Sequence, residues 1–194
     1  MWIGPTGGTF PLVSVTNNAV VSAALGYVEA NPAELEAVRD LVILSLLGPR
    51  ITLRHTLPAH LACRAVVVTP DWHLLQVDDA VRSCWQLPGG HIAEEDSSLL
   101  GSTLRQLRCL TGIDPDALRP ESTLPLDVDA VPVEPVPSLA EPEHVHYDFR
   151  YLLHLPSRDL VAGDAGLRWV PVDDVPGRLG TKLRRCSRDA PALR

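Results

Sequence analysis

The 194-residue sequence lacks several features that mark membrane, secreted and nucleic-acid-binding proteins. No apolar run reaches the roughly 18 residues that a membrane-spanning helix requires. The N-terminus has no basic segment followed by an apolar stretch, so we expect no signal peptide. Lysine is nearly absent, since Lys182 is the only one, and the formal net charge is −7. Because polyanion binding requires a basic face, we interpret the basic run Lys182–Arg188 as a solvated helix end. The sequence therefore predicts neither a nucleic acid nor a membrane as partner.

Cysteine is also scarce. The four cysteines are Cys63, Cys84, Cys109 and Cys186, without CxxC spacing, which argues against zinc knuckles and thioredoxin-type redox motifs. Isolated cysteines of this kind are typical of reduced thiols, so we expect a cytoplasmic protein. Arginine supplies 16 of the 17 basic residues, and alanine, leucine and proline are abundant. This composition favours a bacterial source.

The bulk composition is that of a globular chain. Hydrophobic residues make up 45% and charged residues 21%, a balance typical of proteins that bury a core. We expect an N-terminal extension, residues 1–58, packed on a domain of residues 59–194. Apolar residues recur at helical spacing over about 32–47, and Gly48 ends the pattern. Residues 1–17 are expected to be irregular or a short strand.

The remaining elements follow from alternation, capping and turn signals. A helix is expected to start after Ser97 or Ser98 and to end at Gly112. The proline-rich segment 115–142 is expected to form a long loop, a type that is commonly functional or mobile. The expected strands cover residues 65–69, 74–77, 124–129, 145–155 and 167–172, and a last helix covers 175–185.

A motif at the centre of the sequence carries the strongest functional signal. Residues 85–91 read WQLPGGH and are followed by the expected helix with Arg105 and by Gly112. This arrangement resembles the Nudix hydrolase box, and residues 169–175 resemble the tryptophan-bearing strand before the last helix of that family. The resemblance covers about residues 59–185. It implies an α/β (α+β) domain with the Nudix fold, a mixed β-sheet sandwiched between helices, with an N-terminal helical extension.

The whole chain also resembles a bacterial subgroup of that family with an N-terminal helix. The subgroup carries a PLDxD…EPxHxHxDFRY signature, which here spans residues 125–129 and 141–151. This second resemblance implies no particular substrate.

The box departs from the family at its metal-binding positions. In the family, three glutamates of the box helix hold Mg²⁺, and the matching positions here are Gln106, Cys109 and Leu110. Their spacing puts them on one helix face, and Mg²⁺ demands oxygen ligands that this face does not supply. We therefore expect no cofactor, no metal-binding residues and no ordinary Mg²⁺-dependent hydrolysis. Cys109 is interpreted as a small buried hydrophobe rather than a nucleophile, and Leu110 as a core contact.

Three acids before the box helix leave two interpretations open. Glu94, Glu95 and Asp96 form either a substitute Mg²⁺ site or a solvated acidic loop at a helix N-terminus, where the helix dipole stabilises negative charge. Magnesium is expected as a cofactor only in the first case. One extra loop residue places the family's first glutamate on Asp96 or Ser97, and Asp96 can pair with Arg105 to orient the loop.

A second candidate site lies on the longest expected strand. His144, His146, Asp148 and Arg150 alternate with apolar residues and therefore share one strand face. Such a face suits acid–base work, metal ligation or anion binding; the alternative is a solvent-facing strand without chemistry. We expect a pocket lined by this face, by His91 and by part of the proline-rich segment, which would act as a lid.

These signals define two sets of candidate residues. The candidate catalytic residues are His91, His144, His146 and Asp148. The candidate substrate-binding residues are Trp85, Gly89, Gly90, Arg105, Asp127 and Arg150. Trp85 is expected to face the core or the pocket, with stacking on a planar ligand as the alternative. His55, His60 and His73 are expected to be structural.

The predicted function is that of a repurposed small-metabolite enzyme of bacterial metabolism that works without the three-glutamate magnesium centre. Two alternatives stay open. One is a non-catalytic ligand-binding or regulatory module, and the other is a residual nucleoside-diphosphate-type hydrolase that relies on the acids before the box helix. In each case the expected partner is a small-molecule ligand, with a homodimer as one assembly to be tested.

Overall fold

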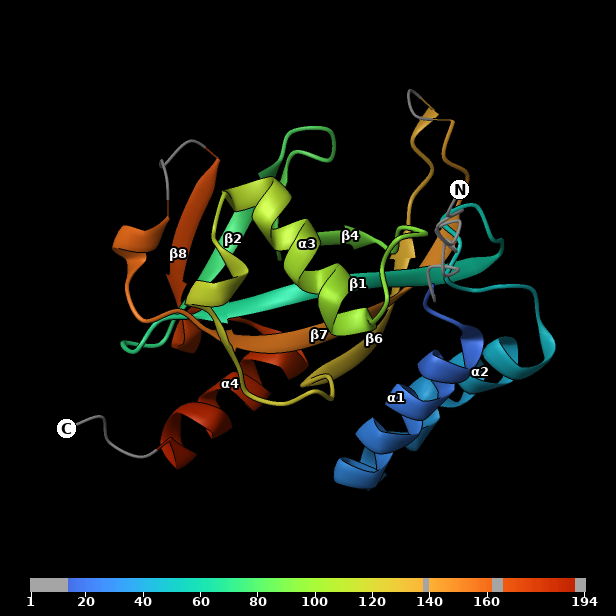
Figure 1. The fold of residues 1–194 in the computed structure, drawn as a ribbon, viewed down its shortest axis with the longest axis horizontal. Coiled ribbons are helices and arrows are strands. Elements are labelled where there is room, and N and C mark those ends of the chain that lie inside the picture. The colour runs from blue at the N-terminus through green and yellow to red at the C-terminus, as the bar shows by residue number, and fades with distance from the viewer. Residues whose placement is uncertain (1–13, 138–139, 162–165, 191–194) are drawn as a thin grey trace, which may run out of the picture.

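An eight-stranded mixed sheet organises residues 14–137, 140–161 and 166–190, the part of the chain that the computed structural model describes. Helices lie on both sides of the sheet (Figure 1), which confirms the expected fold class. The strands are β1 (Ala59–Val68), β2 (His73–Asp79), β3 (Cys84–Gln86), β4 (Gly89–His91), β5 (Arg119–Pro120), β6 (Asp127–Val133), β7 (His144–His154) and β8 (Leu167–Pro171). All of the predicted strands are present, but β1 starts six residues earlier than expected, and β6 starts three residues later and ends four residues later than the strand expected at 124–129.

The pairing of β1 with β7 sets the geometry of the polar residues. The two strands run parallel along their whole length, which places His60 opposite His146 and Arg64 opposite Arg150. Strand β6 pairs with β7 in the antiparallel sense and places Asp127 opposite Arg150. Since residues opposite each other share a face, these five ionisable side chains lie on one face of three adjacent strands.

Four α-helices accompany the sheet. They are α1 (Asn17–Ala30), α2 (Leu35–Leu47), α3 (Leu99–Thr111) and α4 (Gly177–Asp189), with short 3-10 helices at Pro32–Glu34, Pro115–Ala117, Arg158–Leu160 and Val172–Asp174. The caps of α3 are as predicted, because the Ser98 hydroxyl accepts from the Gly101 N–H at 3.0 Å and Gly112 adopts a left-handed φ of 71°. Helix α1 was not predicted. Of the segment expected to be irregular or a strand, residues 1–13 lie outside the described residues, and residues 14–16 form no strand.

Alternate residues of β1 pack against different helices. Val67 contacts the cluster around Leu107 of α3, whereas Val66 contacts the cluster around Leu183 of α4. Helices α3 and α4 therefore cover opposite faces of the sheet (Figure 1). His60 and Arg64 lie an even number of positions from Val66, so their side chains point to the same face of β1 as that of Val66. Farther along the strand, α4 covers this face.

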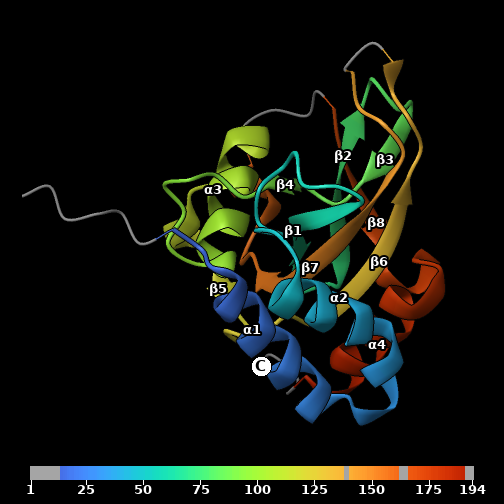
Figure 2. The ribbon, with the colours of Figure 1, turned by 90° about the vertical axis from the view of Figure 1, so that its right-hand side faces the viewer.

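The N-terminal helices pack directly on the sheet. Helices α1 and α2 lie side by side next to β6 (Figure 2). Their buried residues Tyr27 and Leu41 belong to one hydrophobic cluster with Leu61 and Phe149 of the sheet. No helix in the described part of the chain is long and apolar enough to cross a membrane.

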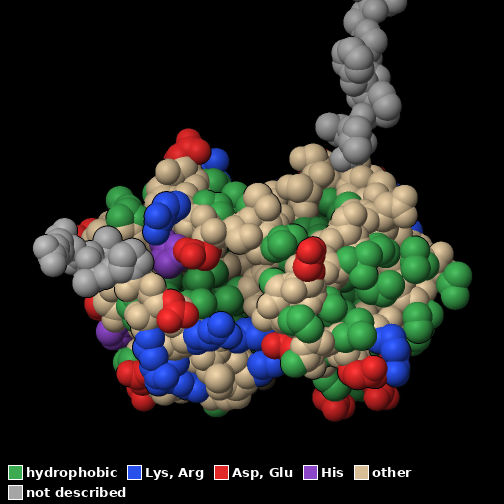
Figure 3. Space-filling model, turned by 90° about the horizontal axis from the view of Figure 1, so that it is seen from below, with side chains coloured by type: hydrophobic (Ala, Val, Ile, Leu, Met, Phe, Trp, Pro, Cys, Tyr) green, Lys and Arg blue, Asp and Glu red, His purple; other side chains and the backbone are tan. Residues whose placement is uncertain are grey.

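The outer side of these helices is apolar. Seen from below, hydrophobic side chains gather over the half of the surface where α1 and α2 lie (Figure 3). The large exposed hydrophobic residues of this region are Leu25, Leu35, Ile43, Leu46 and Leu47. A homodimer that uses this face stays a prediction.

Candidate functional site

Strand β7 separates its side chains by face, as the alternation predicts. Tyr147 and Phe149 belong to the hydrophobic cluster that includes α1 and α2. The alternate residues His144, His146 and Asp148 face the other way, yet they are only 4%, 6% and 6% exposed. The interpretation of this face as a solvated surface is therefore wrong: the ionisable groups are buried among other strands.

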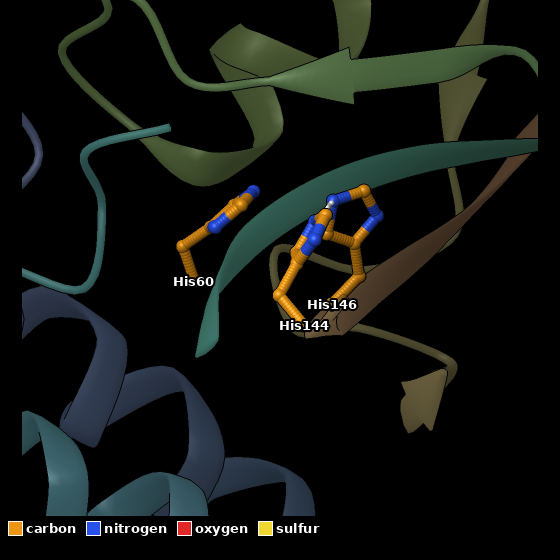
Figure 4. A group of neighbouring side chains, drawn as sticks. All are labelled: His60, His144 and His146. Atoms are coloured by element: carbon orange, nitrogen blue, oxygen red, sulfur yellow. Dashed lines mark hydrogen bonds between the residues drawn. The ribbon is translucent and has the colours of Figure 1, made fainter. Parts of the chain in front are cut away.

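Four histidines from three strands form what we call the histidine cluster. Its members are His60 of β1, His91 of β4, and His144 and His146 of β7. The Nε2 atom of His146 lies 2.9 Å from Nε2 of His144 and 3.2 Å from Nε2 of His91. The ring centroid of His60 is 4.9, 4.6 and 4.8 Å from those of His91, His144 and His146. Figure 4 shows His60 beside the two β7 rings.

Backbone carbonyls orient two of these rings. Nδ1 of His144 is 2.7 Å from the Pro142 oxygen, and Nδ1 of His60 is 3.0 Å from the Thr56 oxygen. A carbonyl oxygen only accepts hydrogen bonds, so in each neutral imidazole the proton resides on Nδ1. The Nε2 atoms of His60 and His144 consequently keep their lone pairs.

Burial disfavours the charged form of three of the four imidazoles in the histidine cluster. Burial lowers the pKa of His146 to about 2, with the neighbouring imidazole of His91 as the next contribution. Burial likewise lowers the pKa of His91 to about 3, and His60 adds to this effect. The pKa of His60 is also lowered by burial. Neutral imidazoles offer lone pairs to a proton or to a cation.

A pocket of about 750 Å³ opens onto one side of this cluster. Its lining brings together His91 and His146 with the double glycine and with part of the proline-rich segment, whereas His144, Asp148 and Arg150 of the predicted strand face do not line it. Three arginines that the sequence did not single out also line it, Arg54, Arg64 and Arg82. The remaining lining residues are Val81, Cys84, Gln86, Gly89, Gly90, Val131, Pro132, Val133, Glu134, Pro135, Val136, Pro137 and Glu141.

The double glycine allows β4 to approach its neighbours. A Cβ on Gly89 would lie 2.2 Å from the Cys63 carbonyl oxygen, and one on Gly90 would lie 3.0 Å from the Gln106 side chain. The close approach lets β4 pair with β1 and places His91 opposite Ala62. These glycines thus position His91 at the pocket.

Asp148 connects the histidine cluster to the arginines. Its carboxylate lies 3.4 Å from Nε of Arg64 and 3.7 Å from Nη2 of Arg150. Burial raises the pKa of Asp148, and the two guanidinium groups oppose this shift. Asp148 and His144 do not line the pocket, so their expected catalytic role would be exerted through Arg64 and His146.

Two predicted substrate-binding residues belong to a buried charge cluster away from the pocket. Asp127 is fully buried and pairs with Arg150 at 2.8 Å, Lys182 at 2.9 Å and Arg178 at 3.0 Å. Tyr27 of α1 also contacts Lys182. These contacts tie α1, α4 and the sheet together, which indicates a structural role for Asp127 and Arg150.

The polar side chains that remain on the box helix form hydrogen bonds and an ion pair within the protein. Arg105 forms a two-pronged ion pair with Asp96, with both N–O distances 2.7 Å, which confirms the predicted pairing. Burial alone would raise the pKa of Asp96, but hydrogen bonds from Arg105 and the Ala93 N–H hold it below its usual range. Gln106 donates to the His91 carbonyl at 2.8 Å. Arg105 is therefore occupied in holding the loop and does not line the pocket.

Two expectations for the outer face of this helix are wrong. Leu110 is 48% exposed rather than in contact with the core, and Cys109 is exposed rather than buried. Both follow from the rotation of α3, which buries Leu107 and Thr103 and turns positions 109 and 110 outward. The two side chains are solvated and belong neither to the core nor to the pocket.

This arrangement predicts different costs for restoring glutamates on the box helix. Gln106→Glu is expected to lower the free energy of unfolding by about 1–3 kcal/mol, because a carboxylate would replace the donor that faces the His91 carbonyl. Leu110→Glu is expected to change it by less than about 0.5 kcal/mol, as for other surface substitutions. Urea unfolding of the two variants tests this, and equal losses would contradict the assigned environments.

Trp85 does not face the core. It is 38% exposed, and the guanidinium carbon of Arg168 lies 4.5 Å from its ring centroid. The edge position of β3 explains this, since β3 pairs only with β2 among the described strands. The ring is not part of the pocket lining, and its role as a stacking platform stays a prediction.

Several residues in and next to the pocket are not evident as site residues from the sequence. The sequence predicts only a structural role for His60, and no motif points to Arg54, Arg64 or Arg82. The available signal was weak: His60 and Arg64 alternate with Leu61 and Cys63 at the start of a strand whose beginning was placed too late. Their proximity to β7 depends on a parallel pairing that no local pattern reveals.

Comparison with known proteins bears on the fold. No family model and no curated protein matches the sequence. Among solved structures, a binary complex of C. elegans Ap4A hydrolase is similar at a TM-score of 0.50 and 15% identity, over 66% of this chain and 96% of that chain. NrtR of Shewanella oneidensis has a TM-score of 0.45 and 22% identity over 66% of this chain and 61% of that chain. RenU, a Nudix hydrolase from M. smegmatis, has a TM-score of 0.45 and 17% identity over 69% of this chain and 90% of that chain.

At these identities the likeness concerns the fold alone. It agrees with the box motif and with the capped helix α3 that follows β4 in the sheet described above. The chain therefore adopts the Nudix hydrolase fold.

Proposed function

We propose that the chain is an enzyme that acts on a small anionic metabolite held in the pocket, with His91 as the acid–base group. The observation that carries this proposal is the meeting of neutral imidazoles and arginines at one pocket. His91 and His146 line it together with Arg54 and Arg64. Imidazoles exchange protons with a bound substrate, and guanidinium groups fix an anionic part of it.

The arginines of the pocket differ in how far they are neutralised. Arg82 pairs with Glu141 at 2.6 Å and with Asp79 at 3.4 Å. Arg64 pairs with Asp148. Arg54 makes no ion pair with any residue in the described ranges. The positive charge left for a ligand is therefore local, which favours a small anionic group such as a phosphate or pyrophosphate over an extended polyanion.

The contacts of the box helix support a function other than ordinary Mg²⁺-dependent hydrolysis. The similar solved structure from C. elegans is that of an Ap4A hydrolase. Here Gln106 is bonded to a backbone carbonyl and the next two positions on that face are exposed and uncharged. Of the acids before the helix, Asp96 is committed to Arg105 and the Ala93 N–H. These contacts argue against a substitute magnesium site that uses Asp96.

A second candidate is a non-catalytic module that binds the same class of ligand. It is favoured by a pocket lined by Arg54 and Arg64 in a chain whose box helix has no carboxylate at positions 106, 109 and 110. The two candidates predict the same ligand contacts and differ in turnover, which the His91 variant described in the Discussion measures.

Anion binding in the pocket is tested with inorganic pyrophosphate as the probe. Arg54→Gln is expected to weaken its binding about tenfold or more, because a hydrogen bond to a charged group contributes about 1.5–3 kcal/mol and about 1.4 kcal/mol corresponds to a factor of ten. Calorimetry at a moderate ionic strength of about 0.1 M and without divalent ions measures the dissociation constant.

The control is Arg39→Gln, which removes the same charge from the outer side of α2, where the side chain is 57% exposed. It is expected to leave pyrophosphate affinity unchanged within about twofold at moderate ionic strength. Wild-type protein that does not bind millimolar pyrophosphate, or an Arg54 variant that binds like the Arg39 variant, would overturn the proposed anion site.

A further inference from the structure

We propose that His60, His144 and His146 bind one divalent transition-metal ion through their Nε2 atoms at the base of the pocket. The proposal does not depend on the proposed function, because the ligands are defined by the geometry of the strands. It also concerns a different place from the box helix, at which no metal is expected.

The separations of the rings fit a single ion. Zinc binds histidine nitrogens at about 2.0–2.1 Å in tetrahedral geometry, which puts two ligand nitrogens about 3.3 Å apart. Nε2 of His144 and Nε2 of His146 are 2.9 Å apart. The potential ligand atoms of all three histidines lie within 4.8 Å of one another. Because the rings of His60 and His144 are stacked, one of them has to turn about its Cβ–Cγ bond to direct its lone pair at a shared ion.

The orientation of the rings fits a metal site as well. Histidines that ligate a metal commonly donate their other ring N–H to a carbonyl or carboxylate, which fixes the tautomer. Nδ1 of His60 and Nδ1 of His144 lie at hydrogen-bond distance from the Thr56 and Pro142 oxygens. Both rings therefore keep a lone pair on Nε2 within the cluster, and their planes are stacked at 18° with centroids 4.6 Å apart (Figure 4).

The Nε2 lone pairs of the histidine cluster outnumber the N–H groups that can donate hydrogen bonds to them. Nε2 of His60 is buried and has no hydrogen-bond partner among the described residues, and the side chain belongs to a residue only 2% exposed. The nearest protein groups are the other imidazoles. His146 can supply one proton on Nε2, whereas Nε2 of His144 and Nε2 of His91 both lie within 3.2 Å of it. A cation would satisfy several acceptors at once, and buried polar groups require such partners.

The ligand type selects the ion. Imidazole nitrogens suit zinc, copper, nickel and iron, whereas magnesium and calcium prefer oxygen. A second group of potential ligands, His91, Glu141 and His146, also lies within 4.8 Å. It shares His146 with the first group and lines the pocket. Glu141 and His91 thus lie on the open side of the proposed site, where a fourth ligand or a pocket-bound molecule would approach.

The test uses the untagged full chain, stripped with a chelator and titrated with Zn²⁺ by calorimetry and with Co²⁺ by visible absorption. We expect one equivalent to bind, with the d–d bands of a tetrahedral Co²⁺ site. His146→Ala and His60→Gln are each expected to weaken the affinity at least about 100-fold, since even outer-shell changes cost 10–100-fold. His73→Ala, a histidine of β2 outside the cluster, is the matched control and is expected to bind normally.

A second experiment distinguishes metal binding by the histidines from metal binding by exposed thiols. The double variant Cys84→Ser/Cys109→Ser is expected to keep the site, and the Co²⁺ spectrum is expected to show no sulfur-to-cobalt band. X-ray absorption at the zinc edge of the wild-type protein needs no variant and is expected to show three imidazoles without sulfur. Absence of binding, binding lost in the thiol variant, or a zinc spectrum without imidazole would each overturn the proposal. Zinc binding without pyrophosphate binding would uphold it while overturning the proposed anion site.

Discussion

Asp127→Asn is expected to lower the free energy of unfolding by about 3–5 kcal/mol, the usual cost of removing one partner from a buried group of charges. The Asp127 carboxylate is fully buried and lies within 3.0 Å of Arg150, Lys182 and Arg178. The amide keeps the shape of the side chain but removes its charge, so three cations lose their shared partner. Urea unfolding monitored by tryptophan fluorescence measures the loss.

The matched control is Asp129→Asn. Asp129 shares two of the same partners, Arg150 at 2.9 Å and Arg178 at 3.1 Å, but its side chain is 38% exposed. Solvent screens this pair, so we expect a loss of about 1 kcal/mol or less. Similar losses in the two variants would show that burial does not set the strength of this charge cluster.

The Asp127 carboxylate also makes the free energy of unfolding depend on pH, in a direction that follows from its pKa shift. Burial alone would raise the pKa of Asp127, but the hydrogen bond and charge of Lys182 and the charges of Arg178 and Arg150 hold it below its ordinary value of 3.8. The stability that this group contributes is present above the ordinary carboxyl pKa and is lost as the pH falls through the lower folded-state pKa. Below about pH 4, wild-type stability should therefore fall more steeply than that of Asp127→Asn.

His91→Gln is expected to reduce turnover at least about 10²-fold, the typical effect of a lost acid–base group. His91 lines the pocket, and burial lowers its pKa to about 3. It is therefore neutral at pH 7, and the negative charge of a bound metabolite would raise its pKa toward the range in which an imidazole exchanges protons. Glutamine retains a polar side chain of similar reach but cannot exchange protons. The assay uses the substrate found by screening phosphorylated metabolites and nucleoside diphosphates with the wild-type protein.

The control for this experiment is His154→Gln at the other end of β7, where the histidine pairs with Glu121 at 2.8 Å on the surface. It is expected to have wild-type turnover. If wild-type protein turns over nothing in the screen but binds pyrophosphate, the non-catalytic module is the better description. Equal turnover in the His91 and His154 variants would remove His91 from the chemistry.

Local interactions explain which features could be derived from the sequence alone. The caps of α3 depend on Ser98 and Gly112, which act within one turn of the helix. The alternation along β7 fixes which side chains face the core, because successive residues of a strand point to opposite faces. The Asp96–Arg105 pair follows from the loop and the first turns of the helix. Each of these involves residues close together in the chain.

The histidine cluster and the buried charges were decided by tertiary structure. His60 and His146 meet because β1 and β7 pair in parallel, and this register is set by packing between strands distant in the chain. The charge cluster similarly joins Tyr27, Asp127 and Lys182 from three distant elements. Their sequence positions alone specify neither proximity nor burial.

The box helix marks the boundary between the two kinds of information. The sequence by itself determined that positions 106, 109 and 110 carry no carboxylate, because this is a matter of residue identity, and helical spacing placed them on one side of α3. Only the tertiary structure decided that Gln106 contacts β4 while Cys109 and Leu110 are exposed. The physical reason is that spacing along a helix fixes which residues are neighbours on its surface, whereas packing against the sheet fixes how the helix is rotated.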